Sequence, residues 1–169
     1  LLPIVVTVVN TIRQAMNASL VYIALFNPTT RMIEIPYMLD HDTPIFEEPP
    51  FPLGEGITST IIKTRRRVFI NQDTERRLVE AGAVPMSTQN GMAKSFIGIP
   101  LVTGENVIGV LSIQDLEREG RFTQNDVDLL TTIAANVAVA IQNARLYAEA
   151  HKRAQREMMV NQIGQKIQS

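Results

Sequence analysis

The 169-residue chain contains no cysteine. This absence excludes disulfide bonds, thiolate metal sites, thiol nucleophiles and thioether-linked cofactors. A chain without cysteine also fits a reducing compartment, and we expect a cytoplasmic protein. Binding or catalysis must therefore depend on other side chains.

An excess of either charge is also missing. The 16 basic and 17 acidic side chains leave a net charge of −1. Broad attraction to nucleic acid or to acidic membranes needs a large basic excess. We therefore expect neither nucleic acid nor a membrane among the partners of this chain.

Long apolar runs are absent as well. No run approaches the roughly 18 residues that a membrane-spanning helix needs. The apolar start "LLPIVVTVV" is short and has no basic leader, so we do not predict a signal peptide. Because the sequence begins at Leu1 rather than at methionine, we expect it to be part of a longer protein.

Apolar periodicity predicts a helix at each end of the chain, with strands between them. Helical spacing runs through residues 4–17. Thr123 and Asp126 form a capping-box variant that predicts the start of a long helix, which no proline interrupts up to Ser169. The elements predicted between these helices are a strand hairpin at 19–27 and 32–39, a helix at 56–64, a strand at 67–71, a weak helix near 74–81 and a second hairpin at 95–102 and 106–116.

This order predicts an α+β fold built on a central, mostly antiparallel sheet. We expect the N- and C-terminal helices on one face of the sheet, with helix 56–64 and the loops over the other. Pro36 predicts that its strand lies at an edge or carries a bulge. The predicted domain covers residues 1–147, and residues 148–169 form a helical connector to a following domain.

The stretch "PLGEGITSTIIKTRRR", residues 52–67, has glycines before a helix and so suggests a phosphate site. It lacks a Gly-Lys-Ser/Thr motif, and Glu55 places negative charge where a phosphate would bind. We interpret Gly54 and Gly56 as permissive backbone that starts the helix. Four cations close its other end and are interpreted as a solvated cap: Lys63, Arg65, Arg66 and Arg67.

Three segments resemble a GAF domain, the small-molecule sensor module of phosphodiesterases, cyclases and bacterial signalling proteins. They are "GEGITSTIIKTRRRVFIN", "SFIGIPLVTGENVIGVLSIQD" and "FTQNDVDLLTTIAANVAVAIQNARLY". The resemblance covers most of the chain and implies a pocket between one sheet face and a variable lid. It also implies a homodimer paired through the first and last helices, and a full-length chain with an output domain such as a histidine kinase.

The chain also departs from some members of that family. Bilin attachment and the GAF-fold methionine sulfoxide reductase both need a thiol, which is absent. Cyclic-nucleotide-binding members carry Asn-Lys, Phe and Asp-Glu across the pocket, whereas Asn71 is followed by Gln72 here and no Asp-Glu pair follows Phe96. These departures disfavour a bilin and a cyclic nucleotide, and we predict no cofactor.

Strand alternation assigns side chains to the two faces of the sheet. Gly98 and Gly109 lack side chains that would obstruct a helix, so we place their tier on the helix-packed face. The tier that carries Ser95, Ser112 and Gln114 is then expected to face the pocket. A buried hydroxyl or amide without a partner costs about 1–3 kcal/mol, so these groups need a ligand, a water or a backbone group.

Four further candidates for ligand binding come from the lid side. They are Thr58, Asp73, Met92 and Lys94. Each also has a purely structural interpretation. Methionine packs adaptably, Asp73 is placed to cap the following helix, and a loop lysine is usually solvated.

The two histidines do not predict a metal site. His41 lies in the loop sequence "DHD" without a second histidine nearby, whereas zinc sites need three or four converging ligands. Haem needs only one axial histidine, so a haem-ligand role for His41 stays open. His151 falls on the connector helix.

The leading hypothesis is a sensory domain that binds a small molecule and relays its occupancy through the terminal helices. The alternative is a ligand-free GAF domain that serves as a dimerisation spacer. The sequence shows no Ser-His-Asp spacing, P-loop or paired-acid motif, so we do not expect an enzyme.

Overall fold

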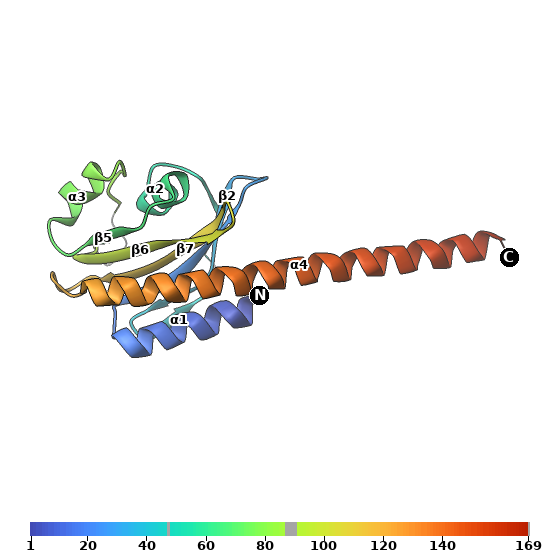
Figure 1. The fold of residues 1–169 in the computed structure, drawn as a ribbon, viewed down its shortest axis with the longest axis horizontal. Coiled ribbons are helices and arrows are strands. Elements are labelled where there is room, and N and C mark those ends of the chain that lie inside the picture. Colours follow the sequence, from blue (N-terminus) through green and yellow to red (C-terminus); the bar gives the residue numbers. More distant parts are fainter. Residues whose placement is uncertain (47, 87–90, 169) are drawn as a thin grey trace.

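A computed structural model of the chain describes residues 1–46, 48–86 and 91–168. It has the α+β architecture expected from the sequence (Figure 1). The elements are α1 (Leu2–Met16), β1 (Leu20–Asn27), β2 (Met32–Asp40), β3 (Thr43–Ile45), β4 (Phe51–Pro52), α2 (Ile57–Thr64), β5 (Val68–Ile70), α3 (Thr74–Glu80), β6 (Ser95–Thr103), β7 (Asn106–Asp115) and α4 (Gln124–Gln168).

The strands form one antiparallel sheet in the order β3-β2-β1-β7-β6-β5, and β4 pairs separately with β2. Both predicted hairpins are present as β1–β2 and β6–β7. The β1–β2 register shifts between Ile23, which faces Tyr37, and Leu25, which faces Glu34. Pro36 lies in this irregular part of β2, so the predicted bulge is confirmed.

Helices α1 and α4 cover one face of the sheet, as expected, and α2 and α3 lie over the other (Figure 1). The face under α1 and α4 is packed by aliphatic side chains at helical spacing, including Val5, Val9 and Ile12 from α1. Leu130 and Ile141 from α4 are fully buried in the same cluster. The opposite face has its own apolar cluster, in which Ile61 of α2 packs with Phe96 and Val110 of the sheet.

The start of α4 is capped as the sequence predicts. The backbone N–H of Asp126 donates to Thr123 Oγ1 at 3.2 Å, and the N–H of Thr123 donates to Asp126 Oδ2 at 2.8 Å. These reciprocal hydrogen bonds form the capping-box variant. They also place a carboxylate in the first turn, where its negative charge interacts favourably with the helix dipole.

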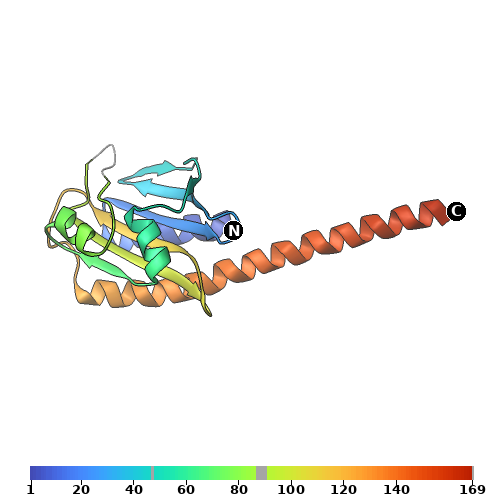
Figure 2. The same ribbon diagram turned by 90° about the horizontal axis from the view of Figure 1, so that it is seen from above.

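Helix α4 is 45 residues long and extends well beyond the folded body (Figures 1 and 2). Its buried residues end at Ile141, and Leu146, Tyr147 and Ile163 are all more than half exposed. By length and composition alone α4 could cross a membrane, but the core helix of a soluble protein passes the same test. A third (33%) of its most apolar window is buried in the body, so this is weak evidence for a span.

Candidate functional site

A cavity of about 240 Å³ lies between the α2-covered sheet face and the segments that surround it. Its floor comes from β1, β6 and β7, and its walls come from α2, α3 and the loops on either side of them. The lining residues are Tyr22, Phe51, Pro52, Gly54, Glu55, Gly56, Ile57, Thr58, Ser59, Thr74, Leu78, Val84, Met86, Gly91, Met92, Ala93, Phe96 and Gln114. Most of this surface is apolar, as in small-molecule pockets generally.

Thr58 brings the first turn of α2 to the cavity. Helix α2 begins after Gly56, whose extended backbone serves as the N-cap. The Thr58 hydroxyl and the Tyr22 hydroxyl are hydrogen-bonded at 3.1 Å, which ties α2 to β1 across the cavity. Ser59 Oγ accepts the backbone N–H of Gly54 at 2.9 Å and fixes the glycine turn. The turn therefore shapes one wall of the cavity and presents hydroxyl groups to it.

Gln114 brings a polar group to the floor of the cavity. Its Nε2 donates to Ser112 Oγ at 3.1 Å, and Ser112 itself is fully buried. The carbonyl oxygen of the Gln114 amide accepts no hydrogen bond from the described residues. Since the side chain lines the cavity, this oxygen is an acceptor that a bound molecule can use.

The predicted faces of Ser95 and Gly98 on β6 were wrong: Ser95 was expected on the pocket face and Gly98 on the face under the terminal helices. Gly98 pairs with Ser112 and Ser95 pairs with Asp115, so Gly98 shares the cavity face and Ser95 the opposite face. A Cβ on Gly98 would lie 2.4 Å from Ile61 Cδ1, so this glycine does admit a helix, but that helix is α2. Alternation alone relates residues within one strand, whereas the pairing register relates two strands.

Asp73 and Lys94 also lie outside the cavity lining. Asp73 precedes α3 in a left-handed conformation (φ 49°), makes no capping hydrogen bond with its side chain and pairs with Arg76 at 3.1 Å. The backbone of Lys94 donates to the Asp115 carbonyl at 2.8 Å and accepts from Thr74 Oγ1 at 3.3 Å. Of the seven candidates, Thr58, Met92 and Gln114 line the cavity, and Ser112 supports Gln114 from below.

Sequence reasoning missed Tyr22, Thr74, Met86 and Phe96, which also line the cavity. Tyr22 faces Ser112 across the β1–β7 pairing, so the correct register would have placed both on one face. Phe96 would follow from its pairing with Gln114 in the same way. Met86 comes from a long loop, for which the sequence carries no positional signal.

Among the described residues that line the cavity there is no lysine, arginine or histidine, and Glu55 is the one charged residue. It therefore fits a neutral or cationic small molecule better than a phosphate or carboxylate ligand. No group of three or more potential metal ligands occurs in residues 1–46, 48–86 and 91–168. His41 lies away from the cavity lining and is hydrogen-bonded to Asp40 at 2.8 Å and Glu117 at 2.9 Å.

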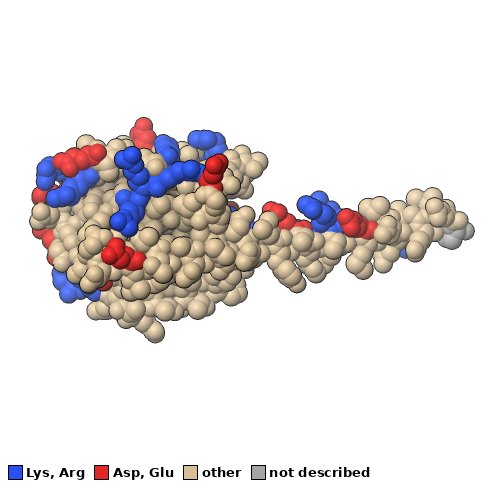
Figure 3. Space-filling view, viewed as in Figure 1, with Lys and Arg blue, Asp and Glu red and all other residues tan. Residues whose placement is uncertain are grey.

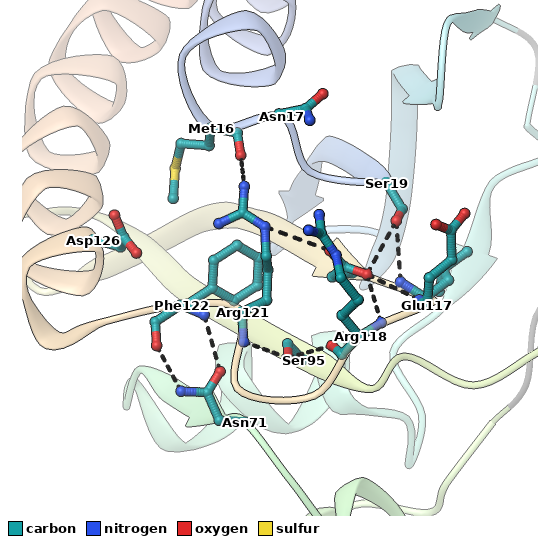
Figure 4. A network of polar contacts seen from close by, with 12 residues as sticks. Met16, Asn17, Ser19, Asn71, Ser95, Glu117, Arg118, Arg121, Phe122 and Asp126 are labelled. Carbon is teal, nitrogen blue, oxygen red and sulfur yellow. Dashed lines mark hydrogen bonds and ion pairs between the residues drawn. The ribbon is translucent and has the colours of Figure 1, made fainter.

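A polar network lies on the α1 and α4 side of the sheet, at the end of β7 (Figure 4). Asp115, the neighbour of Gln114 on β7, accepts the backbone N–H groups of Glu117 and Arg118 at 2.9 Å each. Its carboxylate also pairs with the guanidinium groups of Arg118 at 3.3 Å and Arg121 at 3.6 Å. Ser19 Oγ donates to Asp115 Oδ1 at 3.5 Å. We call Asp115, Ser19, Ser95, Arg118 and Arg121 the Asp115 network.

The Asp115 network joins the end of α1 to the segment that leads into α4. Arg121 Nη2 donates to the Met16 carbonyl at the end of α1. The Ser95 hydroxyl donates to the Arg118 carbonyl at 2.7 Å and accepts the Arg121 N–H at 3.2 Å, so it fixes the turn before α4. Beyond it, the side chain of Asn71 forms two hydrogen bonds with the backbone of Phe122 (Figure 4).

The charge of Asp115 is stabilised although its side chain is almost completely buried. Burial alone would raise the pKa of Asp115, but the N–H groups of Glu117 and Arg118 and the Arg118 guanidinium outweigh it and lower the pKa. The buried carboxylate is therefore ionised at neutral pH and holds its donors in place.

Comparison with known proteins gives one consistent family. Residues 4–142 match the family model described as GAF domain. Over 125 residues the chain is 29% identical to the Nif-specific regulatory protein of Herbaspirillum seropedicae, a match that covers 73% of the chain and 22% of that protein. Over 116 residues it is 28% identical to the formate hydrogenlyase transcriptional activator FhlA of Escherichia coli, covering 69% and 17%. The chain thus spans about a fifth of the length of these curated relatives.

Solved structures agree on the fold. The GAF domain of an Acinetobacter phosphoenolpyruvate-protein phosphotransferase superposes with a TM-score of 0.66 at 17% identity, covering 84% of this chain and 82% of that one. The free methionine-R-sulfoxide reductase of Neisseria meningitidis gives a TM-score of 0.67 at 15% identity, covering 85% and 78%. At such low identity the likeness is one of fold alone, and it assigns neither activity to this chain.

Proposed function

The chain belongs to the GAF domain family, and we propose that it is the small-molecule-sensing domain of a longer transcriptional regulator. One of these curated relatives is named as a regulatory protein and the other as a transcriptional activator, and neither is named as a histidine kinase. The histidine kinase output expected from the sequence is therefore replaced by a transcriptional output domain in the same full-length chain. Such a regulator would act in the cytoplasm, with its DNA contacts outside this domain.

The observation that carries the proposal is the cavity with polar groups at its floor and wall. The Gln114 amide oxygen has no described partner, and the Tyr22 and Thr58 hydroxyl groups bond only each other among the described residues. Apart from Glu55, Ser59 and Thr74, the other described lining residues are apolar side chains, glycines or proline. This combination suits a small, uncharged molecule with hydrogen-bonding groups, because the apolar wall provides burial and the few polar groups orient it.

The relay would run along β7 to the Asp115 network. Gln114 lines the cavity, while Asp115, the next residue, holds the turn that leads into α4. On the lid side, Thr74 lines the cavity and its hydroxyl donates to the backbone carbonyl of Lys94. The backbone N–H of Lys94 in turn donates to the carbonyl of Asp115. A ligand that favours one position of these groups would shift the population of α4 orientations relative to the sheet.

A binding screen tests the proposal. Neutral metabolites are screened by thermal shift and confirmed by calorimetry, and each hit is measured against Gln114→Leu and Thr58→Val. Loss of one buried hydrogen bond corresponds to an affinity loss of about tenfold. Gln72→Leu, the same change at an exposed loop position, is the matched control and should bind like the wild type. A hit that binds all variants equally would contradict a site in this cavity.

The exposed part of α4 supports a second proposal, dimerisation. Beyond Ile141 it presents apolar side chains to solvent, among them Leu146, Met158, Val160 and Ile163. Exposed apolar side chains on a helix are buried when two copies pair. Sedimentation of the chain against its 1–147 truncation tests this, since only the longer form should dimerise. Dimerisation without any hit in the metabolite screen would favour the ligand-free spacer.

A further inference from the structure

A second surface feature lies outside the cavity, where α2 turns into β5. Arg65, Arg66 and Arg67 are consecutive and all exposed. Figure 3 shows Lys and Arg side chains gathered on the face above α4, in the region where Figure 1 places the end of α2. We call these three residues the arginine segment.

The arginine segment has no ion-pair partner among the described residues. Arg67 Nη1 donates to Thr131 Oγ1 of α4 at 3.3 Å, which holds this guanidinium against the helix surface. Neighbouring Lys63 donates to the Gly54 carbonyl and thereby serves the glycine turn. The three consecutive residues carry the same charge, and carboxylates of a partner would complement it.

The backbone of the arginine segment is also unusual. Arg65 caps the end of α2 in the left-handed conformation, with φ at 59°. Glycine or asparagine is favoured at such a position because a Cβ is disfavoured there. Residues that do not match the conformational preference of their backbone position occur more often at functional positions than elsewhere. Local backbone energetics therefore do not explain the arginine.

Beside the arginine segment lies a hollow of about 310 Å³ between β6 and α4. Arg65 and Arg67 form its rim together with Thr131. Its other lining residues are apolar: Ile99, Pro100, Val102 and Ala135. Val102 is 37% exposed although it is aliphatic. The surface therefore combines unpaired cations with an uncovered apolar floor.

We propose that this surface docks an acidic segment of another protein domain, with carboxylates on the arginine segment and one apolar side chain in the hollow. Charge complementarity selects an acidic partner, and the apolar floor selects a protein segment over nucleic acid. A nucleic-acid site would need a longer basic surface than three residues in a chain of net charge −1. This inference goes beyond the sensing proposal and does not depend on the cavity.

A short model peptide, with glutamates on both sides of two central leucines, tests the proposal on the complete chain. Binding is followed by calorimetry and by NMR shifts of Ala135 and Val102. We expect R65Q/R66Q/R67Q to bind it about tenfold more weakly, because each exposed pair contributes modestly. The matched control K152Q/R153Q/R156Q removes three exposed cations from the distal part of α4 and should bind like the wild type.

Further variants separate the components of the surface. Ala135→Gln should weaken binding by filling the hollow without changing charge, and a glutamine version of the peptide should not bind. Thermal unfolding confirms that each variant is folded. Gln114→Leu should leave peptide binding unchanged, so a failure of the sensing proposal is distinguishable from a failure here. Equal binding by both triple variants, no binding by the wild type, or tighter binding of a DNA duplex would overturn the proposal.

Discussion

The two faces of the sheet differ in how completely they are packed. The face under α1 and α4 is covered by a 15-residue helix and by the first part of a 45-residue helix. The face under α2 and α3 has helices of 8 and 7 residues, and between them a cavity of about 240 Å³. The interior under α1 and α4 is therefore a packed core, with a hollow at its β6 edge, whereas the other face keeps room for a ligand over the middle of the sheet.

Polar groups follow the same division. On the α1 and α4 face, Asp115 and Ser95 are almost completely buried and make several hydrogen bonds. On the cavity face, Gln114 makes one hydrogen bond from its nitrogen and leaves its oxygen available. Buried polar groups with complete partners rigidify a structure, whereas groups with spare capacity are available to ligands. The difference indicates a fixed platform on one face and an adaptable site on the other.

The largest expected effect comes from truncating an aliphatic side chain on each face. Leu130→Ala removes a fully buried side chain of α4 and should lower the free energy of unfolding by about 3 kcal/mol. Leu78→Ala removes a side chain that adjoins the cavity and packs on fewer neighbours there, so we expect a loss at the lower end of the range for buried leucines, about 2 kcal/mol. Urea unfolding measures both, and equal losses would contradict the division into a closed and an open face.

Neutralising Asp115 should have the next largest effect. Asp115→Asn keeps the shape but removes the charge that Arg118 and Arg121 pair with, and about 2 kcal/mol should be lost at neutral pH. Because folding lowers the pKa of Asp115, its contribution to the free energy of unfolding is present above the ordinary value of 3.8 and is lost as pH falls through the lower folded value. Asp73→Asn, at an exposed ion pair, should change stability by less than about 0.5 kcal/mol.

The smallest expected effect concerns His41, at the edge of the α1 side. Its bonds to Glu117 and Asp40 raise its pKa, Arg13 Nε donates to its backbone carbonyl, and Asp42 pairs with Arg13 at 3.6 Å. Because its pKa is raised by folding, protonated His41 contributes fully to the free energy of unfolding below about pH 6.5, and this contribution is lost as pH rises through the folded pKa.

The pH dependence of stability checks this interpretation of His41. We expect the free energy of unfolding, measured with urea, to fall slightly between pH 6 and pH 8, by less than about 1 kcal/mol, because the ring is 47% exposed. His41→Asn keeps a residue that tolerates the left-handed backbone found here (φ 53°) and should remove the dependence. A wild-type profile as flat as that of the variant would show that these bonds add no stability.

Much of the fold follows from local patterns in the sequence. The helical spacing of Val5, Val9 and Ile12, the Thr123–Asp126 capping box and the two hairpins each have a local physical cause, and each was predicted. The connection at 40–53 also contains two short strands, β3 and β4, which exist only because β2 is available to pair with them. Thr43, Ile45 and Phe51 favour strands, but Pro44 and Pro52 interrupt the pattern, so the sequence of this connection does not predict them.

The candidate site was predicted less completely. Thr58 and Met92 were placed near the cavity because they flank elements whose ends the sequence marks, and Gln114 because alternation put it on a polar tier. Ser95 was misplaced because the relative register of β6 and β7 was not known. Asp73 and Lys94 were misplaced because the direction of a loop side chain depends on neighbours from distant segments.

The sequence by itself determined the periodicity of the helices, the alternation of the strands, the absence of thiol chemistry and the α+β class. These properties depend on residues a few positions apart, which local sterics and hydrogen bonding relate directly. Only the tertiary structure decided that Ser95 belongs to the Asp115 network, that Tyr22 meets Thr58, and that the arginine segment borders an apolar hollow. Those relations depend on strand register and on packing between distant segments, which no local pattern encodes.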